Sequence, residues 1–267
     1  STSRGLGDVY KRQSIVFGGV SLATVLGIPA GTILGEHAGW RAVFAALSIL
    51  SLLVFVVVAW SVPAVRISKA SMRGAMSAVL KDRPLRAVFG ATALIVTGNF
   101  LAYTYIAPYL EQIAHRSPSQ VSLMLLAYGA AGVVANFTIG PFAAKALRTS
   151  LAVVTALLAI SLAVMNLAVD NPAAMVALLA AWGAAYGALP VLLQTCVFND
   201  ASAIDGGADG ATSINVAVFN AAIGLGALVG GLVINATGPR LIPVVSAGFV
   251  AVGLALVIAT RRWHRRG

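Results

Sequence analysis

Amide and aromatic side chains recur inside long apolar stretches of this chain, several of them one helical turn apart. Residues four apart lie on the same face of a helix, so each row would present its polar groups together. Amides donate and accept hydrogen bonds, and ring faces stack on apolar or sugar-like surfaces. Because the set carries no charge, it favours a small neutral or amphiphilic solute. The candidate residues are Asn99, Tyr103, Tyr186, Gln194, Asn215 and Phe219.

A second interpretation of these residues remains open. Amide side chains in membranes also hydrogen-bond from helix to helix, each contributing about 0.6 kcal/mol on average. That use would be structural and would need no solute.

Catalytic chemistry is disfavoured by the distribution of reactive residues. The three histidines, His37, His115 and His264, lie among charged residues with no carboxylate or thiol cluster beside them. The single cysteine, Cys196, excludes an internal disulfide and gives no metal cluster. The sequence therefore predicts no catalytic residues, no metal and no cofactor.

The elements that must position the candidate residues are membrane-spanning helices. Each of eight windows free of Asp, Glu, Lys and Arg is long enough to cross a hydrocarbon core of roughly 30 Å as a helix. The eight windows are Gln13–Gly35, Ala42–Val65, Ala87–Leu110, Ser117–Ala144, Thr149–Val169, Asn171–Asn199, Gly210–Pro239 and Leu241–Thr260. We therefore expect an all-α polytopic membrane protein with eight spans.

Composition and charge support this fold class. The chain is 59% hydrophobic and 10% charged, and its mean hydropathy is +0.92. The net charge of +10 would suggest nucleic acid in a soluble protein, but here the positive-inside rule explains it. Alternate gaps between the windows hold twelve Lys and Arg residues against three in the opposite set. The rule places the richer set, and with it both chain ends, in the cytoplasm.

Residues 1–13 differ from the rest of the chain. The segment STSRGLGDVYKRQ is polar and has no apolar core, so it is not a signal peptide. It resembles a translated sequencing adapter, and we expect it to be a non-native leader. The sequence after it starts inside a helix, which implies missing sequence upstream.

The first window carries a stripe of small residues. The stripe recurs every four residues, which would let a neighbouring helix approach to backbone contact. A proline within it would bend the helix at mid-membrane. The residues are Gly19, Ala23, Gly27, Gly31 and Gly35, with Pro29 as the proline.

The motif Gly27-Ile-Pro29-Ala-Gly31, followed by Gly39-Trp40-Arg41, resembles the antiporter motif of the major facilitator superfamily. That motif marks family helix five in the twelve-helix drug:proton antiporter branch. The likeness extends over residues 14–260, and the later segments resemble arabinose-efflux and chloramphenicol-efflux members most. One departure is Ala144, which stands where the family often has an acidic residue.

The resemblance implies the major facilitator superfamily fold, with the eight spans corresponding to family helices five to twelve. Residues 14–62 would then be the last two helices of the N-terminal half, and 63–86 the basic cytoplasmic loop between the halves. Residues 87–260 would form the C-terminal six-helix bundle, and 261–267 a basic cytoplasmic tail.

The resemblance also implies a secondary active transporter that exports its solute by alternating access. Its partners would be the small-molecule solute, protons and the lipid bilayer, with no nucleic acid, and its location the bacterial inner membrane. Because the eight windows hold no Asp, Glu, Lys, Arg or His, the proton carrier is expected on the missing helices one to four. A channel and a non-transporting membrane scaffold remain alternatives.

Overall fold

The computed structural model describes residues 34–35, 38–61 and 69–263, and two compact units divide the chain, Ser1–Arg66 and Ile67–Gly267. In the first unit, the helix Ala38–Ser61 is long and apolar enough to cross a membrane. In the second, six more helices meet the same criterion, so seven of the eight expected spans are present among the described residues. The first window, Gln13–Gly35, lies almost entirely outside them.

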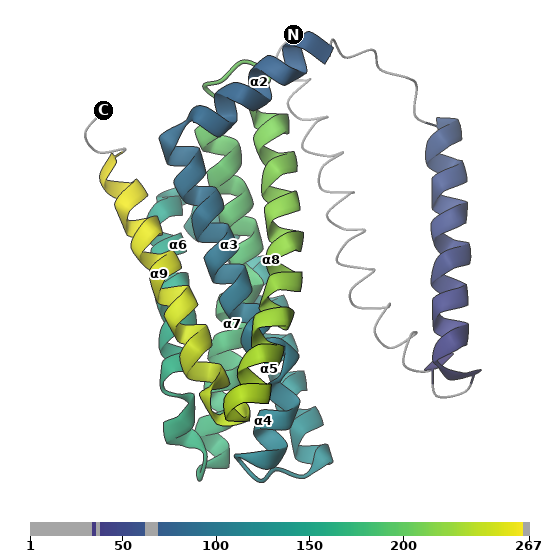
Figure 1. Ribbon diagram of the computed structural model, residues 1–267, viewed down its shortest axis with the longest axis vertical. Coiled ribbons are helices and arrows are strands. Elements are labelled where there is room, and N and C mark those ends of the chain that lie inside the picture. Colours follow the sequence, from purple (N-terminus) through teal and green to yellow (C-terminus); the bar gives the residue numbers. More distant parts are fainter. Residues whose placement is uncertain (1–33, 36–37, 62–68, 264–267) are drawn as a thin grey trace. The chain divides into compact units, whose positions relative to one another are not determined.

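The second unit is a bundle of long helices, seen along its length in Figure 1. Its α-helices are α2 (Lys69–Lys81), α3 (Arg83–Thr104), α4 (Ile106–Gln112), α5 (Pro118–Thr138), α6 (Gly140–Ala163), α7 (Pro172–Ala201), α8 (Gly207–Thr237) and α9 (Ile242–Trp263). Two short 3-10 turns lie between helices: η1 (Met165–Ala168) follows α6, and η2 (Pro239–Leu241) follows α8.

Short polar side chains begin several of these helices. Asp82 caps α3 by accepting a hydrogen bond from the Leu85 backbone N–H at 2.9 Å. Ser117 and Gln120 form a capping box at the start of α5, and Asn171 caps α7. Each cap is followed by a proline in the first turn, where its missing N–H removes no helical bond.

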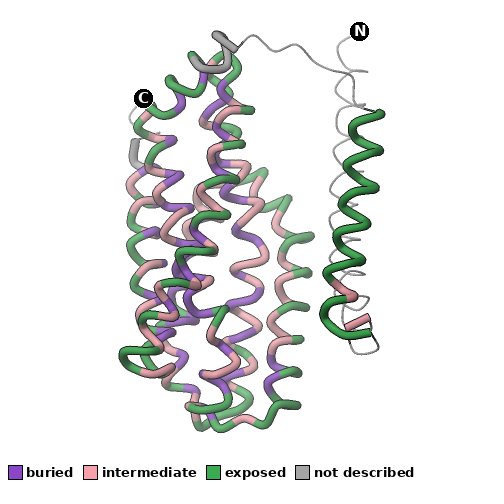
Figure 2. Tube along the Cα trace, turned by 45° about the vertical axis from the view of Figure 1, so that its right-hand side comes forward, coloured by how far each residue is buried: buried purple, intermediate pink, exposed green. Residues whose placement is uncertain are grey.

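The bundle is built by two sets of three helices that pack in the same way. In the first set, α3 packs against α8 and α9; in the second, α7 packs against α5 and α6. The third helices, α6 and α9, also contact each other, as do α3 and α7. When α3 is treated as the equivalent of α7, α8 of α5 and α9 of α6, the helix contacts within one set correspond to those within the other. Buried residues follow the inward faces of these helices (Figure 2).

Glycines bring the helix backbones into contact along these seams. A Cβ on Gly183 of α7 would overlap the carbonyl oxygen of Tyr128 on α5, and one on Gly187 would overlap that of Gly132. A Cβ on Gly226 of α8 would lie 2.6 Å from the carbonyl oxygen of Thr97 on α3. Membrane helices use small residues for close packing, because an apolar side chain gains little free energy by moving from lipid into a contact between helices.

Several boundaries differ from the expected ones, and proline explains two of them. The third window does not continue to Leu110, because Pro108 cannot donate to the carbonyl of Thr104, where α3 ends. Pro141 likewise breaks the fourth window, so that α5 ends at Thr138. Residues 140–144, which the fourth window assigned to its own span, belong to α6 instead, and α6 departs from helical geometry at Ala146 (φ −156°, ψ 61°).

The basic segment 63–86 also differs from a plain loop. It contains α2, and α3 begins within it at Arg83.

Candidate functional site

The buried amide Asn99 lies at the contact between α3 and α7. Its Oδ1 accepts a hydrogen bond from Nε1 of Trp182 at 2.8 Å, and both side chains are fully buried. The Nδ2 of Asn99 has no hydrogen-bond partner of good geometry among the described residues, although the Tyr128 phenol on α5 interacts with the Asn99 side chain. A buried donor without a partner costs about 1–3 kcal/mol, so an acceptor oxygen arriving here would be stabilised.

Five rings from α3, α5 and α7 form a connected aromatic cluster beside this amide. Trp182 meets Tyr128 edge-to-face with ring centroids 5.1 Å apart, and Tyr128 meets Tyr103 at 5.3 Å. Phe100 contacts Tyr103 at 5.9 Å and Tyr186 at 5.7 Å. The cluster runs from a fully buried tryptophan to Tyr103, which is 43% exposed. It therefore offers ring surface at a face of the bundle, backed by a buried amide.

A second polar feature, the polar chain, joins Thr92, Asn215 and Gln194 across three helices. Thr92 on α3 donates to Oδ1 of Asn215 on α8 at 3.0 Å. Nδ2 of Asn215 then donates to Oε1 of Gln194 on α7 at 2.9 Å. Thr92 and Asn215 are buried, whereas Gln194 is half-buried. The chain thus satisfies its inner members and leaves Gln194 at its accessible end.

The aromatic cluster and the polar chain lie at different depths. Thr92 and Asn99 are seven residues apart on α3, which is about 10 Å along a helix. On α7, Pro190 lies between Tyr186 of the cluster and Gln194 of the polar chain. Because a proline removes a helical hydrogen bond, it weakens α7 at the step between the two levels.

The structure brings most of the predicted site residues into these two features. The aromatic cluster contains Tyr103 and Tyr186, and Asn99 is the buried amide beside it. The polar chain contains Gln194 and Asn215, which are hydrogen-bonded to each other. Phe219 lies one turn after Asn215 on α8 and is half-buried. Four members are not among the six candidate residues: Phe100, Tyr128, Trp182 and Thr92. Isolated rings and threonines in apolar windows resemble ordinary membrane-helix residues, so only the helix pairing reveals them.

One end of the bundle holds an ion pair that sequence reasoning also missed. Arg148 of α6 and Asp200 of α7 form a salt bridge of 2.6 Å, with side chains 17% and 7% exposed. Arg148 also donates to the Thr260 hydroxyl of α9 at 3.0 Å. Charge counting ended the window Asn171–Asn199 just before Asp200 and so left this residue outside the spans. The structure instead uses it to tie three helices together.

The opposite end, where α4 and η2 lie, is held by neutral groups as well as arginine. The Tyr109 hydroxyl donates to Oδ1 of Asn166 at 2.9 Å, and Nδ2 of Asn166 donates to the Arg240 carbonyl at 3.2 Å. Arg116 donates to the Val169 carbonyl at 2.6 Å. These bonds connect the loops that join the spans at this end.

The predicted antiporter stripe lies outside the described residues at Gly19, Ala23, Gly27, Pro29 and Gly31. Its last member, Gly35, is described, and a Cβ there would make an ordinary 3.5 Å contact with Val43 of the same unit. The helix packing proposed for the stripe therefore stays a prediction.

Comparisons with known proteins agree on one family. A family model described as Major Facilitator Superfamily matches residues 7–204 and 88–266. An uncharacterized MFS-type transporter of Bacillus subtilis is 35% identical over 83% of this chain and 55% of its own length. A probable sugar efflux transporter of Haemophilus influenzae is 29% identical over 92% of the chain and 62% of its own length. An inner membrane transport protein of Escherichia coli is 33% identical over 95% and 67%.

Proposed function

Because this chain belongs to the major facilitator superfamily and carries several helices long enough to cross a membrane, we propose that the complete protein exports a small neutral or amphiphilic solute. The solute class is drug-like or sugar-like. Export would proceed by alternating access, in which one helix set moves against another around a central site. The chain spans 55% and 62% of the length of two of its relatives, so the proposed activity is that of the complete transporter.

The observation that carries this proposal is the pairing of an aromatic cluster with a buried amide whose Nδ2 has no hydrogen-bond partner of good geometry. Ring faces at Tyr103 and Tyr128 suit an apolar or sugar-ring surface, and Nδ2 of Asn99 suits a carbonyl, ether or hydroxyl oxygen. No member of the cluster or of the polar chain carries a formal charge. A strongly ionic solute would therefore find no counter-charge at either level. The name of the Haemophilus relative, a probable sugar efflux transporter, is compatible with this class.

The glycine seams and Pro190 support the alternating-access part of the proposal. Backbones in contact at Gly183 and Gly226 can slide without first displacing side chains, and α7 is weakened at Pro190 between the two levels. A movement of this kind would expose the aromatic cluster and the polar chain in turn.

Proton coupling is part of the proposal, with its carrier on the part of the complete transporter beyond this chain. Within the described spans, Arg148 and Asp200 are paired with each other near a helix end, and the amide and aromatic levels hold no carboxylate. A carrier needs a group that titrates near neutral pH and is reached from both sides in turn.

The test is accumulation in bacterial cells that lack their own major exporters. The complete reading frame containing this chain is expressed, and retention of a fluorescent amphiphilic dye and of a radiolabelled sugar is measured. We expect lower retention of at least one of them, abolished by a protonophore. Asn99→Ala should reduce export, whereas Asn235→Ala, an exposed amide near the end of α8, should not.

Two outcomes would contradict the proposal. Equal retention with and without the gene would favour a non-transporting scaffold. Flux that always follows the solute gradient and ignores the protonophore would favour a channel.

A further inference from the structure

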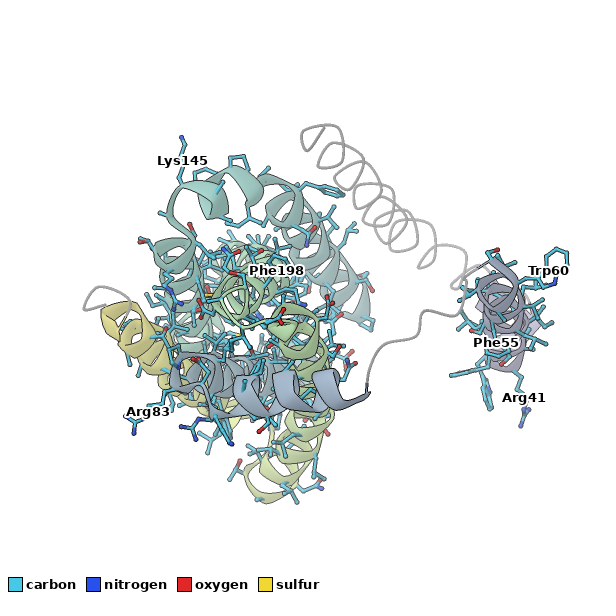
Figure 3. The ribbon with its side chains drawn as sticks, turned by 90° about the horizontal axis from the view of Figure 1, so that it is seen from above. Arg41, Phe55, Trp60, Arg83, Lys145 and Phe198 are labelled. Carbon is cyan, nitrogen blue, oxygen red and sulfur yellow. The ribbon has the colours of Figure 1, made fainter. Side chains whose placement is uncertain are left out.

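Helix α2 lies across one end of the bundle, whereas the spans run along it. In the view from above, α2 crosses the ends of the other helices with Arg83 just beyond it (Figure 3). It packs on α8 and α3 through Ala75 and Val79, which are buried and four residues apart. A Cβ on Gly206, just before α8, would lie 3.7 Å from Cβ of Ala75. The packing therefore fixes which face of α2 points away from the bundle.

Two apolar side chains, Met76 and Leu80, lie beside the packed face of α2, and Met76 borders α8, since a Cβ on Gly210 would lie 3.5 Å from its Cγ. Met76 is 36% exposed and Leu80 is 50% exposed, and one helical turn separates them. A helix with an exposed apolar stripe, lying across the end of a membrane-spanning bundle, is placed where headgroups meet acyl chains. The two side chains would contact the upper part of those chains.

Exposed cations follow directly at the junction of α2 and α3. Lys81, Arg83 and Arg86 are all exposed, and Arg83 extends outward from the bundle in Figure 3. The one acidic residue among them, Asp82, accepts the Leu85 N–H as the cap of α3. The neighbouring acids are exposed as well: Asp205 lies between α7 and α8, and Asp209 lies in the first turn of α8, where they oppose this positive charge. The three cations therefore form one basic cluster at the α2–α3 junction.

We propose that the α2–α3 junction, formed by Met76, Leu80, Lys81, Arg83 and Arg86, binds the headgroups of anionic phospholipids. The phosphates pair with the three cations, and the acyl chains lie against Met76 and Leu80. The membrane leaflet at this end would thereby set the position of α2, and through Ala75 and Val79 the ends of α8 and α3. This binding is independent of any transported solute.

The first experiment measures lipid binding to the full chain purified in a neutral detergent. Phosphatidylglycerol and phosphatidylcholine are titrated separately and followed by native mass spectrometry. We expect phosphatidylglycerol to bind more tightly, with the preference shrinking as salt rises. Each basic side chain at an anionic surface contributes a factor of about five, so Arg83→Gln should weaken phosphatidylglycerol binding about fivefold. The combined change Lys81→Gln, Arg83→Gln and Arg86→Gln should remove the preference.

Matched variants separate this site from general attraction to a cationic protein. Arg240→Gln removes one exposed charge at the opposite end and should leave the binding unchanged. Asp205→Asn with Asp209→Asn should strengthen it, because the opposing charge is lost. Leu80→Gln should weaken the binding of both lipids, since it removes the acyl contact. Equal affinity for the two lipids, or equal losses in Arg83→Gln and Arg240→Gln, would overturn the proposal. Gel filtration confirms that each variant remains folded.

Discussion

The helix Ala38–Ser61 and α3 are both long enough to span a membrane, yet they differ in composition and in burial. Among the seven candidate spans of the described residues, Ala38–Ser61 has the highest mean hydropathy and α3 the lowest. None of the apolar window of Ala38–Ser61 is buried within its own unit, whereas 72% of that of α3 is buried in the bundle. The less apolar helix is thus the more buried one.

This difference shows what holds the bundle together. Lipid tails are as apolar as leucine, so burial of apolar side chains brings little gain in a membrane. The buried helix instead carries groups that lipid cannot satisfy, namely Thr92, Thr97 and Asn99, and a glycine, Gly98, that allows close approach. A Cβ on Gly98 would lie 2.8 Å from the carbonyl oxygen of Ser246 on α9. Close packing and polar pairing therefore distinguish α3 from Ala38–Ser61.

The largest effect is expected where a glycine of α8 meets α3. Gly226→Leu would drive a side chain into the Thr97 carbonyl and separate the two helices, so we expect loss of folded protein. The matched control is Gly224→Leu, two residues away, where nothing lies within 4 Å of the added Cβ. The yield of monodisperse protein after detergent extraction measures both. Equal yields for the two variants would mean that the α3–α8 seam does not depend on close approach.

The next effect concerns the ion pair of α6 and α7. Asp200→Asn leaves the Arg148 guanidinium without its counter-charge, which costs about 3–5 kcal/mol when a pair is fully buried. Because Arg148 is 17% exposed, water compensates in part, and we expect a loss of about 2–3 kcal/mol. The fall in thermal-unfolding midpoint measures it. Asp205→Asn, at an exposed acid after α7, is the control and should leave the midpoint within error of the wild type.

Sequence reasoning located the spans because charge is excluded from the hydrocarbon core whatever the helices pack against. The windows beginning near Ala87 and Asn171, for example, correspond to α3 and α7. The bends were harder to foresee, since the windows treated Pro108 and Pro141 as ordinary interior residues. The start of α6 and the end of α7 were also misplaced, because charge counting excluded Arg148 and Asp200 from the spans. These two residues neutralise each other, so both can lie within helices.

The candidate site was predictable only as a set of polar residues. One-turn spacing identified Asn99, Gln194 and Asn215, but it did not show which side chains on other helices they would bond to. The bond between Asn99 and Trp182 joins residues 83 apart, and that between Thr92 and Asn215 joins residues 123 apart. Such pairs depend on which helices are neighbours, and a single sequence with no contact information does not contain that order.

A smaller effect is expected from the polar chain. Asn215→Leu removes the middle member of the polar chain, so the hydrogen bonds from Thr92 to Asn215 and from Asn215 to Gln194 are both lost. Helix-to-helix hydrogen bonds in membranes average about 0.6 kcal/mol, with a maximum of about 1.7, so we expect a loss of about 1–2 kcal/mol for the two bonds. Asn220→Leu is the control, because within the described part of the chain the Asn220 amide donates to the Val216 carbonyl of its own helix and to no other helix. A loss as large in the control would show that any amide in α8 matters, and not the chain.

The smallest effect should be seen in the helix Ala38–Ser61. Leu52 is 62% exposed, so Leu52→Ala removes no packed neighbour and exchanges one lipid-compatible side chain for a smaller one. Alanine is also the stronger helix former, which offsets part of the lost apolar surface. We expect the thermal-unfolding midpoint of the purified chain to stay within error of the wild type. A fall comparable to that of Asn215→Leu would show that hydropathy alone does not describe this helix, and that its Leu52 face is packed against protein.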